Sequence, residues 1–175
     1  YIFGFLSYDI KNELEALDSL NNDNVDFPMA YFFVPSYVLE INGNKPRYLQ
    51  GEENEKSTSF VKNFMSSNTE KTSYSFNWKS RTSKDDYLNK IALIKENIRV
   101  GNVYELNYCQ EYYAENVEIT NPSTFYNTLN NASLAPVSSL LYFDDLMVFS
   151  ASPERFIKKQ GNQLYSEPIK GTAPR

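Results

Sequence analysis

The stretch VSSLLYFDDLMVFSASPERFIKKQGNQLYS, residues Val137–Ser166, decides the fold class. It holds four short runs rich in apolar, aromatic and β-branched residues, and we predict a strand for each of the ranges 137–143, 146–150, 156–159 and 163–166. The pairs Asp144-Asp145 and Gly161-Asn162 separate these runs and are typical of tight turns. Successive strands are therefore expected to return alongside one another as hairpins.

The clearest helix lies upstream, from Lys84 to about Val100. Ser83 is followed three residues later by Asp86, which resembles a capping box, and Gly101 is placed to end the helix. One apolar stripe runs along it, formed by Tyr87, Ile91, Ile94 and Ile98.

Weaker patterns predict further elements. Apolar residues favour strands at 1–6 and 30–41, Asn42-Gly43 indicates a hairpin turn, and 51–59 is predicted as a loop. Short helices are predicted around 60–65 and from Pro122 to about Leu129, and period-two alternation predicts strands at 74–78 and 103–108. Helices and hairpins segregate along the chain, so we predict an α+β fold with mainly antiparallel sheets and helices packed outside.

Composition narrows the chemistry. The chain has no histidine, which removes His-dependent triads and His metal ligands and leaves carboxylates, lysines, tyrosines and Cys109. A net charge of −5 argues against nucleic acid as a partner, and the sequence has no apolar run long enough for a membrane helix. The single Cys109 cannot form an internal disulfide and is expected to be a half-buried strand residue; we expect a cytoplasmic protein.

Two segments near the end of the sequence combine charged residues with Pro or Gly. They are Ser152-Pro153-Glu154-Arg155-Phe156 and Pro168-Ile169-Lys170-Gly171-Thr172-Ala173-Pro174-Arg175. A predicted hairpin lies between them, so Glu154 and Lys170 could return within reach of each other. On pattern alone, both are more typical of solvated surface charges than of catalytic groups. Arg155 fits a structural role, such as an ion pair to an acidic neighbour, as well as it fits a role in the site.

These segments, together with Gly101-Asn102-Val103-Tyr104-Glu105-Leu106-Asn107, resemble the chorismate-utilising enzymes. Gly4-Phe5-Leu6-Ser7-Tyr8-Asp9 resembles a stretch of that family's amino-terminal region. The resemblance implies that residues 1–82 belong to this amino-terminal region and residues 83–175 to the first part of the chorismate-binding domain.

Lys170 favours one group within the family. In the equivalent motif the anthranilate synthases carry Ala, whereas the aminodeoxychorismate synthases carry Lys. The resemblance implies amination of chorismate to 4-amino-4-deoxychorismate through a covalent adduct of Lys170, with Glu154 as the acid and base, and Gly171 and Thr172 as substrate contacts. Only about 0.04% of a lysine amine is neutral at pH 7 at the ordinary pKa of ~10.4, so such a site must lower the pKa of Lys170.

The resemblance also implies a glutamine amidotransferase partner that supplies ammonia, and Mg²⁺ bound by glutamates beyond residue 175. We therefore expect both ends of the sequence to be cuts and this chain not to turn over chorismate alone. An anthranilate or isochorismate synthase is an alternative within the family. A non-catalytic regulatory or partner-binding domain, in which Glu154 and Lys170 are surface charges, is an alternative of another class.

Overall fold

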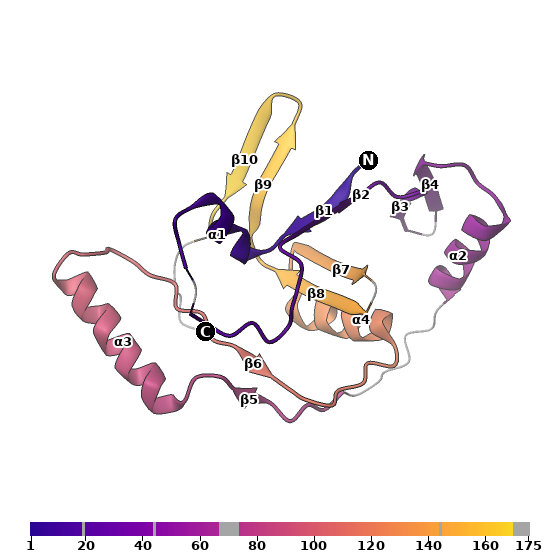
Figure 1. The fold of residues 1–175 in the computed structure, drawn as a ribbon. Helices are drawn as coiled ribbons and strands as arrows, with labels where there is room; N and C mark the ends of the chain where they lie inside the picture. Colours follow the sequence, from indigo (N-terminus) through magenta and orange to yellow (C-terminus); the bar gives the residue numbers. More distant parts are fainter. Residues whose placement is uncertain (19, 44, 67–73, 144, 170–175) are drawn as a thin grey trace. The chain divides into compact units, whose positions relative to one another are not determined.

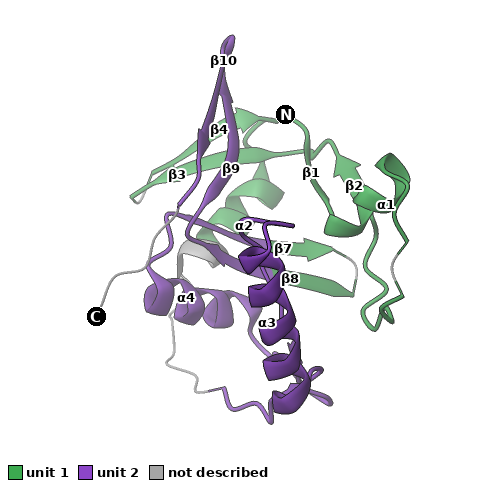
Figure 2. Cartoon of the chain, turned by 90° about the vertical axis from the view of Figure 1, so that its left-hand side faces the viewer, with its two compact units in different colours: residues 1–69, 141–148 green, residues 70–140, 149–175 purple. Residues whose placement is uncertain are grey.

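The computed structural model describes residues 1–18, 20–43, 45–66, 74–143 and 145–169. The chain divides into two compact units, one of residues 1–69 and 141–148 and the other of residues 70–140 and 149–175 (Figure 2). The domain boundary predicted between residues 82 and 83 rests on the resemblance alone and stays a prediction.

The first unit contains two antiparallel hairpin-like pairs and short helices (Figure 1). Strand β1 (Phe3–Leu6) pairs with β2 (Ala30–Phe33), and β3 (Val38–Asn42) pairs with β4 (Lys45–Gln50). The helical elements are η1 (Tyr8–Ile10), α1 (Lys11–Leu14) and α2 (Glu55–Ser66). Gly43 has φ +60°, which confirms the hairpin turn predicted at Asn42-Gly43.

The second unit contains the two longer helices α3 (Lys84–Arg99) and α4 (Pro122–Ser133). The short strands β5 (Lys79–Ser80) and β6 (Tyr112–Tyr113) pair with each other, and β9 (Arg155–Gln160) pairs with β10 (Gln163–Glu167). The hairpin of β7 (Val137–Phe143) and β8 (Leu146–Ser152) contributes residues to both units. The α+β fold and the four strands predicted between residues 137 and 166 are confirmed; Asp144 lies outside the described residues.

Helix α3 forms as predicted because both of its ends are satisfied locally. The Ser83 Oγ accepts a hydrogen bond from the Asp86 N–H at 3.1 Å. At the other end Gly101 has φ +83°, and the amides of Gly101 and Asn102 donate to the carbonyls of Ile98 and Asn97, the bonding of a Schellman motif.

Packing within each unit is dominated by aromatic rings. In the first unit the Phe5 ring lies 4.7 Å from that of Phe27, and the Tyr31 ring lies 4.0 Å from that of Phe143. In the second unit Phe125 of α4 contacts Phe149 of β8 at 4.7 Å. Among the described apolar residues only Val38 and Val61 are buried, at 9% and 7% exposure.

Three predicted elements are wrong. Helix α2 begins at Glu55, inside the predicted 51–59 loop. Residues 74–78 form no strand, because Tyr74 and Phe76 pack their rings edge-on against Phe125 instead of pairing along a ladder. Residues 103–108 also form no strand, and no described strand pairs with them; the ladder of this region joins β5 to β6. No helix of the described chain is both long and apolar enough to cross a membrane.

Candidate functional site

Glu154 lies in the short turn between β8 and β9. The Ser152 hydroxyl holds this turn, since its Oγ donates to the Glu154 carbonyl at 2.9 Å and accepts from the Glu154 N–H at 3.3 Å. The Glu154 side chain is exposed. The backbone of the predicted acid and base is therefore fixed, while its carboxylate is accessible to a ligand.

The β9–β10 hairpin brings Glu167, which precedes the second predicted motif, opposite Arg155 of the first motif. Arg155, next to Glu154, pairs in register with Glu167, and its Nε lies 3.4 Å from Oε2 of Glu167. The expectation that Arg155 pairs with an acidic neighbour is thus confirmed. Sequence reasoning did not identify Glu167 as the partner, because the predicted strands 156–159 and 163–166 exclude both residues and their pairing depends on a register shift.

Lys170, Gly171 and Thr172 lie outside the described residues. Their predicted roles as nucleophile and substrate contacts stay predictions. The described chain reaches Ile169, whose side chain is 57% exposed. The described pairing of β10 ends at Glu167, opposite Arg155, which follows Glu154 in the chain.

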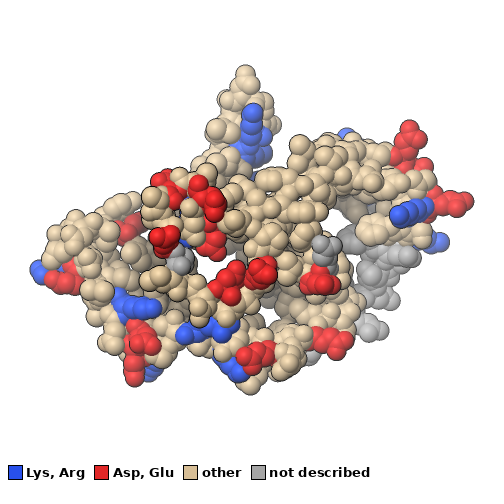
Figure 3. All heavy atoms as spheres, in the orientation of Figure 1, with Lys and Arg blue, Asp and Glu red and all other residues tan. Residues whose placement is uncertain are grey.

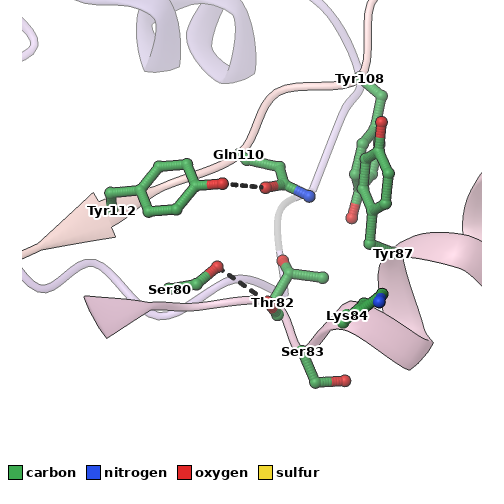
Figure 4. Close-up of a pocket in the computed structure, with 8 residues that line it drawn as sticks. All are labelled: Ser80, Thr82, Ser83, Lys84, Tyr87, Tyr108, Gln110 and Tyr112. Carbon is green, nitrogen blue, oxygen red and sulfur yellow. Dashed lines mark hydrogen bonds between the residues drawn. The ribbon is translucent and has the colours of Figure 1, made fainter. Parts of the chain in front are cut away.

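A separate pocket of about 550 Å³ opens at the start of α3 (Figure 4). Hydroxyl groups, one amide and one amine line it, from Ser80, Thr82, Ser83, Lys84, Tyr87, Tyr108, Gln110 and Tyr112. The rings of Tyr87 and Tyr108 lie together at 5.6 Å, and the Tyr112 hydroxyl donates to Gln110 Oε1 at 3.0 Å. Glu154, the predicted site residue that lies within the described part of the chain, is not in this lining.

Two ion pairs lie next to this pocket, at strands β5 and β6. Lys79 Nζ lies 2.7 Å from Glu115 Oε2, and Arg81 Nε lies 3.0 Å from Glu111 Oε1. The hydrogen bond from Lys79 lowers the pKa of Glu115, and the same bond raises the pKa of Lys79. The Arg81 guanidinium stacks 3.6 Å from the centre of the Tyr113 ring. These pairs account for the local structure around β5 and β6 without a ligand.

The prediction for Cys109 is wrong. Cys109 is exposed and lies outside any strand, because residues 103–110 do not join a sheet. Tyr104, which lies in the strand predicted at 103–108, is 87% exposed.

The described residues do not fit a magnesium site. They contain no group of three or more Cys, Asp or Glu side chains that could hold a metal ion. On the face shown in Figure 3 some acidic side chains lie beside lysines or arginines and others do not. Of the acidic side chains with a lowered pKa, Glu96 pairs with Arg99 and Glu115 with Lys79, whereas Asp23 accepts from backbone amides.

The fold and the two motifs together define a chorismate-utilising class of protein. The family model described as chorismate binding enzyme matches residues 1–175. The chain therefore belongs to the chorismate-binding enzyme family.

Curated relatives fall into two synthase groups. Aminodeoxychorismate synthase component 1 of Escherichia coli (strain K12) is 24% identical over 174 residues, which cover 98% of this chain and 38% of that protein. Anthranilate synthase component 1 of Lactococcus lactis subsp. lactis (strain IL1403) is 25% identical over 187 residues, which cover 98% of this chain and 41% of that protein. The chain thus spans about two fifths of the length of these relatives, whose identities to it do not separate the two groups.

A solved structure has the same fold. It is anthranilate synthase component I from Streptococcus pneumoniae TIGR4, with a TM-score of 0.71 and 17% identity, covering 93% of this chain and 40% of that one. At this identity the likeness concerns the fold alone.

Proposed function

We propose that this chain carries the nucleophile and the acid and base of an enzyme that aminates chorismate at ring carbon 4. The product is 4-amino-4-deoxychorismate, and ammonia comes from a glutamine amidotransferase partner. Lys170 is the nucleophile, Glu154 the acid and base, and Gly171 and Thr172 contact the substrate. This function belongs to the para-aminobenzoate branch of folate synthesis, in the cytoplasm.

The observation that carries the proposal is the pairing of Arg155 with Glu167 at the base of the β9–β10 hairpin. Only Pro168 and Ile169 separate Glu167 from Lys170 in the sequence. In the sequence, Lys170 thus follows within three residues of the rung that adjoins Glu154. This supports a site in which the side chains of Glu154 and Lys170 approach one substrate.

The reaction balances with these two side chains. The neutral Lys170 amine forms a bond to ring carbon 2, the conjugated double bonds shift, and the bond from carbon 4 to its hydroxyl breaks. Glu154 gives the departing hydroxyl a proton, so that water leaves. Ammonia then bonds to carbon 4, the double bonds return, the bond from carbon 2 to Lys170 breaks, and Glu154 takes a proton from the new amine.

The covalent step explains why a lysine at position 170 favours amination at carbon 4. An amine bonded at carbon 2 keeps ammonia out of that position. Ammonia is directed to carbon 4, and the enolpyruvyl group stays on the ring. Magnesium, which the resemblance implies, would have its ligands outside the described residues, and none of the steps above depends on it.

The full gene product tests this proposal when it is assayed with chorismate, ammonium and Mg²⁺. We expect 4-amino-4-deoxychorismate by mass spectrometry without release of pyruvate. Lys170→Ala should abolish turnover, and Glu154→Gln should lower kcat by about 10²- to 10⁴-fold, the usual contribution of a general acid or base.

Lys158→Ala is the matched control, because Lys158 is an exposed lysine on β9 of the same hairpin. It should keep the wild-type rate. Pyruvate release with anthranilate as product would replace the proposal by anthranilate synthase, and isochorismate as product by isochorismate synthase. Unchanged turnover in Lys170→Ala would reject the covalent role.

A further inference from the structure

We propose that Arg155 and Glu167 are positioning residues, whose ion pair holds the base of the β9–β10 hairpin in the register that brings the end of β10 beside Glu154. This inference rests on the proposed function, because the register matters for catalysis only if Glu154 and Lys170 act on one substrate. Neither side chain is assigned contact with the substrate.

The hairpin has two different registers along its length. Near the turn it is regular, with Gln160 opposite Gln163 and Lys158 opposite Tyr165. At the base the register shifts by one residue, so that Arg155 lies opposite Glu167. Continuing the regular pairing would instead place Phe156 opposite Glu167. The base of the hairpin therefore has a competing register one residue away.

A slip of one residue matters because side chains alternate between the two faces of a strand. Extending the observed register by one residue would place Pro168, which follows Glu167, opposite Glu154. In the slipped register it would face Arg155, and every residue after it would turn to the other side. The slip would thus change the approach of the segment that leads to Lys170.

Burial of apolar side chains does not select the observed register. Phe156 is 85% exposed and Leu164 is 69% exposed, so neither is tied to one face by packing. Pro168 has no N–H to donate, so it cannot add a backbone hydrogen bond to the ladder after Glu167. The ion pair at the last rung is the interaction that distinguishes the two registers, because only the observed register places these opposite charges across from each other.

The size of the effect follows from exposure. The side chains of Arg155 and Glu167 are 38% and 66% exposed, and exposed ion pairs change an equilibrium by about five-fold at most. We therefore expect Arg155→Ala and Glu167→Ala each to lower kcat for chorismate by about two- to five-fold, with KM nearly unchanged.

A double-mutant cycle in the full gene product tests the coupling. The variant with both alanines should lose no more activity than either single variant, whereas Arg155→Lys, which keeps the charge, should recover at least half of the lost rate. The matched control is the cross-strand pair Arg47–Glu40 of the β3–β4 hairpin, at 2.8 Å and also exposed. Alanine at either control position should leave kcat unchanged.

Register is measured independently by backbone nuclear Overhauser effects between residues 155 and 167, which Arg155→Ala should weaken in favour of contacts between residues 156 and 167. Additive losses, an unchanged kcat, or an unchanged register in Arg155→Ala would each overturn the inference. If the wild type makes no 4-amino-4-deoxychorismate, the proposed function itself fails, and with it the catalytic purpose of the pair, even where the register responds.

Discussion

The hydrogen-bond network around Ser57 gives the sharpest stability prediction. Ser57 is 4% exposed, and its Oγ accepts from the Tyr48 hydroxyl at 2.8 Å and from the Asn54 N–H at 3.0 Å. In return the Ser57 N–H donates to Asn54 Oδ1 at 3.0 Å. This reciprocal pair is a capping box at the start of α2, and Tyr48 links it to β4.

Ser57→Ala removes the acceptor for both donors. The Asn54 N–H is near solvent and regains water, whereas the half-buried Tyr48 hydroxyl loses its partner. A lost cap costs about 1 kcal/mol and a buried donor without an acceptor about 1 to 3 kcal/mol. We expect the free energy of unfolding, measured by urea denaturation with circular dichroism, to fall by about 2 kcal/mol.

Two further variants isolate the cause. Tyr48→Phe removes one of the bonds and should cost about 1 kcal/mol, and the double variant should cost clearly less than the sum of the two. Ser59→Ala, at an exposed position on the same helix, should change stability by less than about 0.5 kcal/mol. A Ser57→Ala variant as stable as Ser59→Ala would refute the reasoning.

Two other predictions follow from backbone geometry and from charge. Gly51 has φ +76°, and an added Cβ would lie 2.5 Å from the Ser36 carbonyl oxygen, whereas Gly43 has φ +60° with open space around it. Gly43→Ala should therefore lower the free energy of unfolding in urea by about 1 to 2 kcal/mol, and Gly51→Ala by clearly more. Equal losses for the two variants would contradict the predicted clash at Gly51. The Lys79–Glu115 bond lowers the pKa of Glu115 from its ordinary 4.5 and raises that of Lys79 from its ordinary 10.5. Its stabilisation should be fully present between these ordinary values, and be lost as the pH falls through the lowered pKa of Glu115 or rises through the raised pKa of Lys79. Unfolding of Glu115→Gln against wild type across pH measures this, and a difference that persists at pH 2 would contradict it.

Elements set by local chemistry could be predicted from the sequence. Helix α3 has its cap, its stripe and its terminal glycine within one stretch, and the turns at Gly43 and Gly161 need the positive φ that glycine adopts without strain. The start of α2 could not be read in the same way. Its capping box uses Asn54 and Ser57, and Ser at the third helical position is not the Glu or Gln that marks such a box.

Elements set by tertiary contacts were not predictable from periodicity. The alternation at residues 74–78 suits a strand, yet these rings pack on Phe125, and the Tyr74 hydroxyl donates to the Asn121 carbonyl at 3.1 Å. The same limit applies to the site. Glu154 was singled out from a local motif, whereas the pairing of Glu167 with Arg155 depends on a register shift that no local pattern in the sequence indicates.

The β9–β10 hairpin gives a structural reason for the number of residues between Glu154 and Lys170 in the sequence. Strand β9 has six residues and β10 has five, and Gly161 turns the chain between them with φ +59°. The extra residue on β9 is taken up by the register shift, which leaves Glu154 and the residue after Glu167 at the same end. The side chains between the two motifs are largely exposed and can vary, but the number of residues cannot change by one without turning the residues that lead to Lys170 to the other face. The spacing of the two motifs is thus a geometric requirement of the proposed site. The Arg155–Glu167 ion pair at the base of the hairpin stabilises the register that meets this requirement.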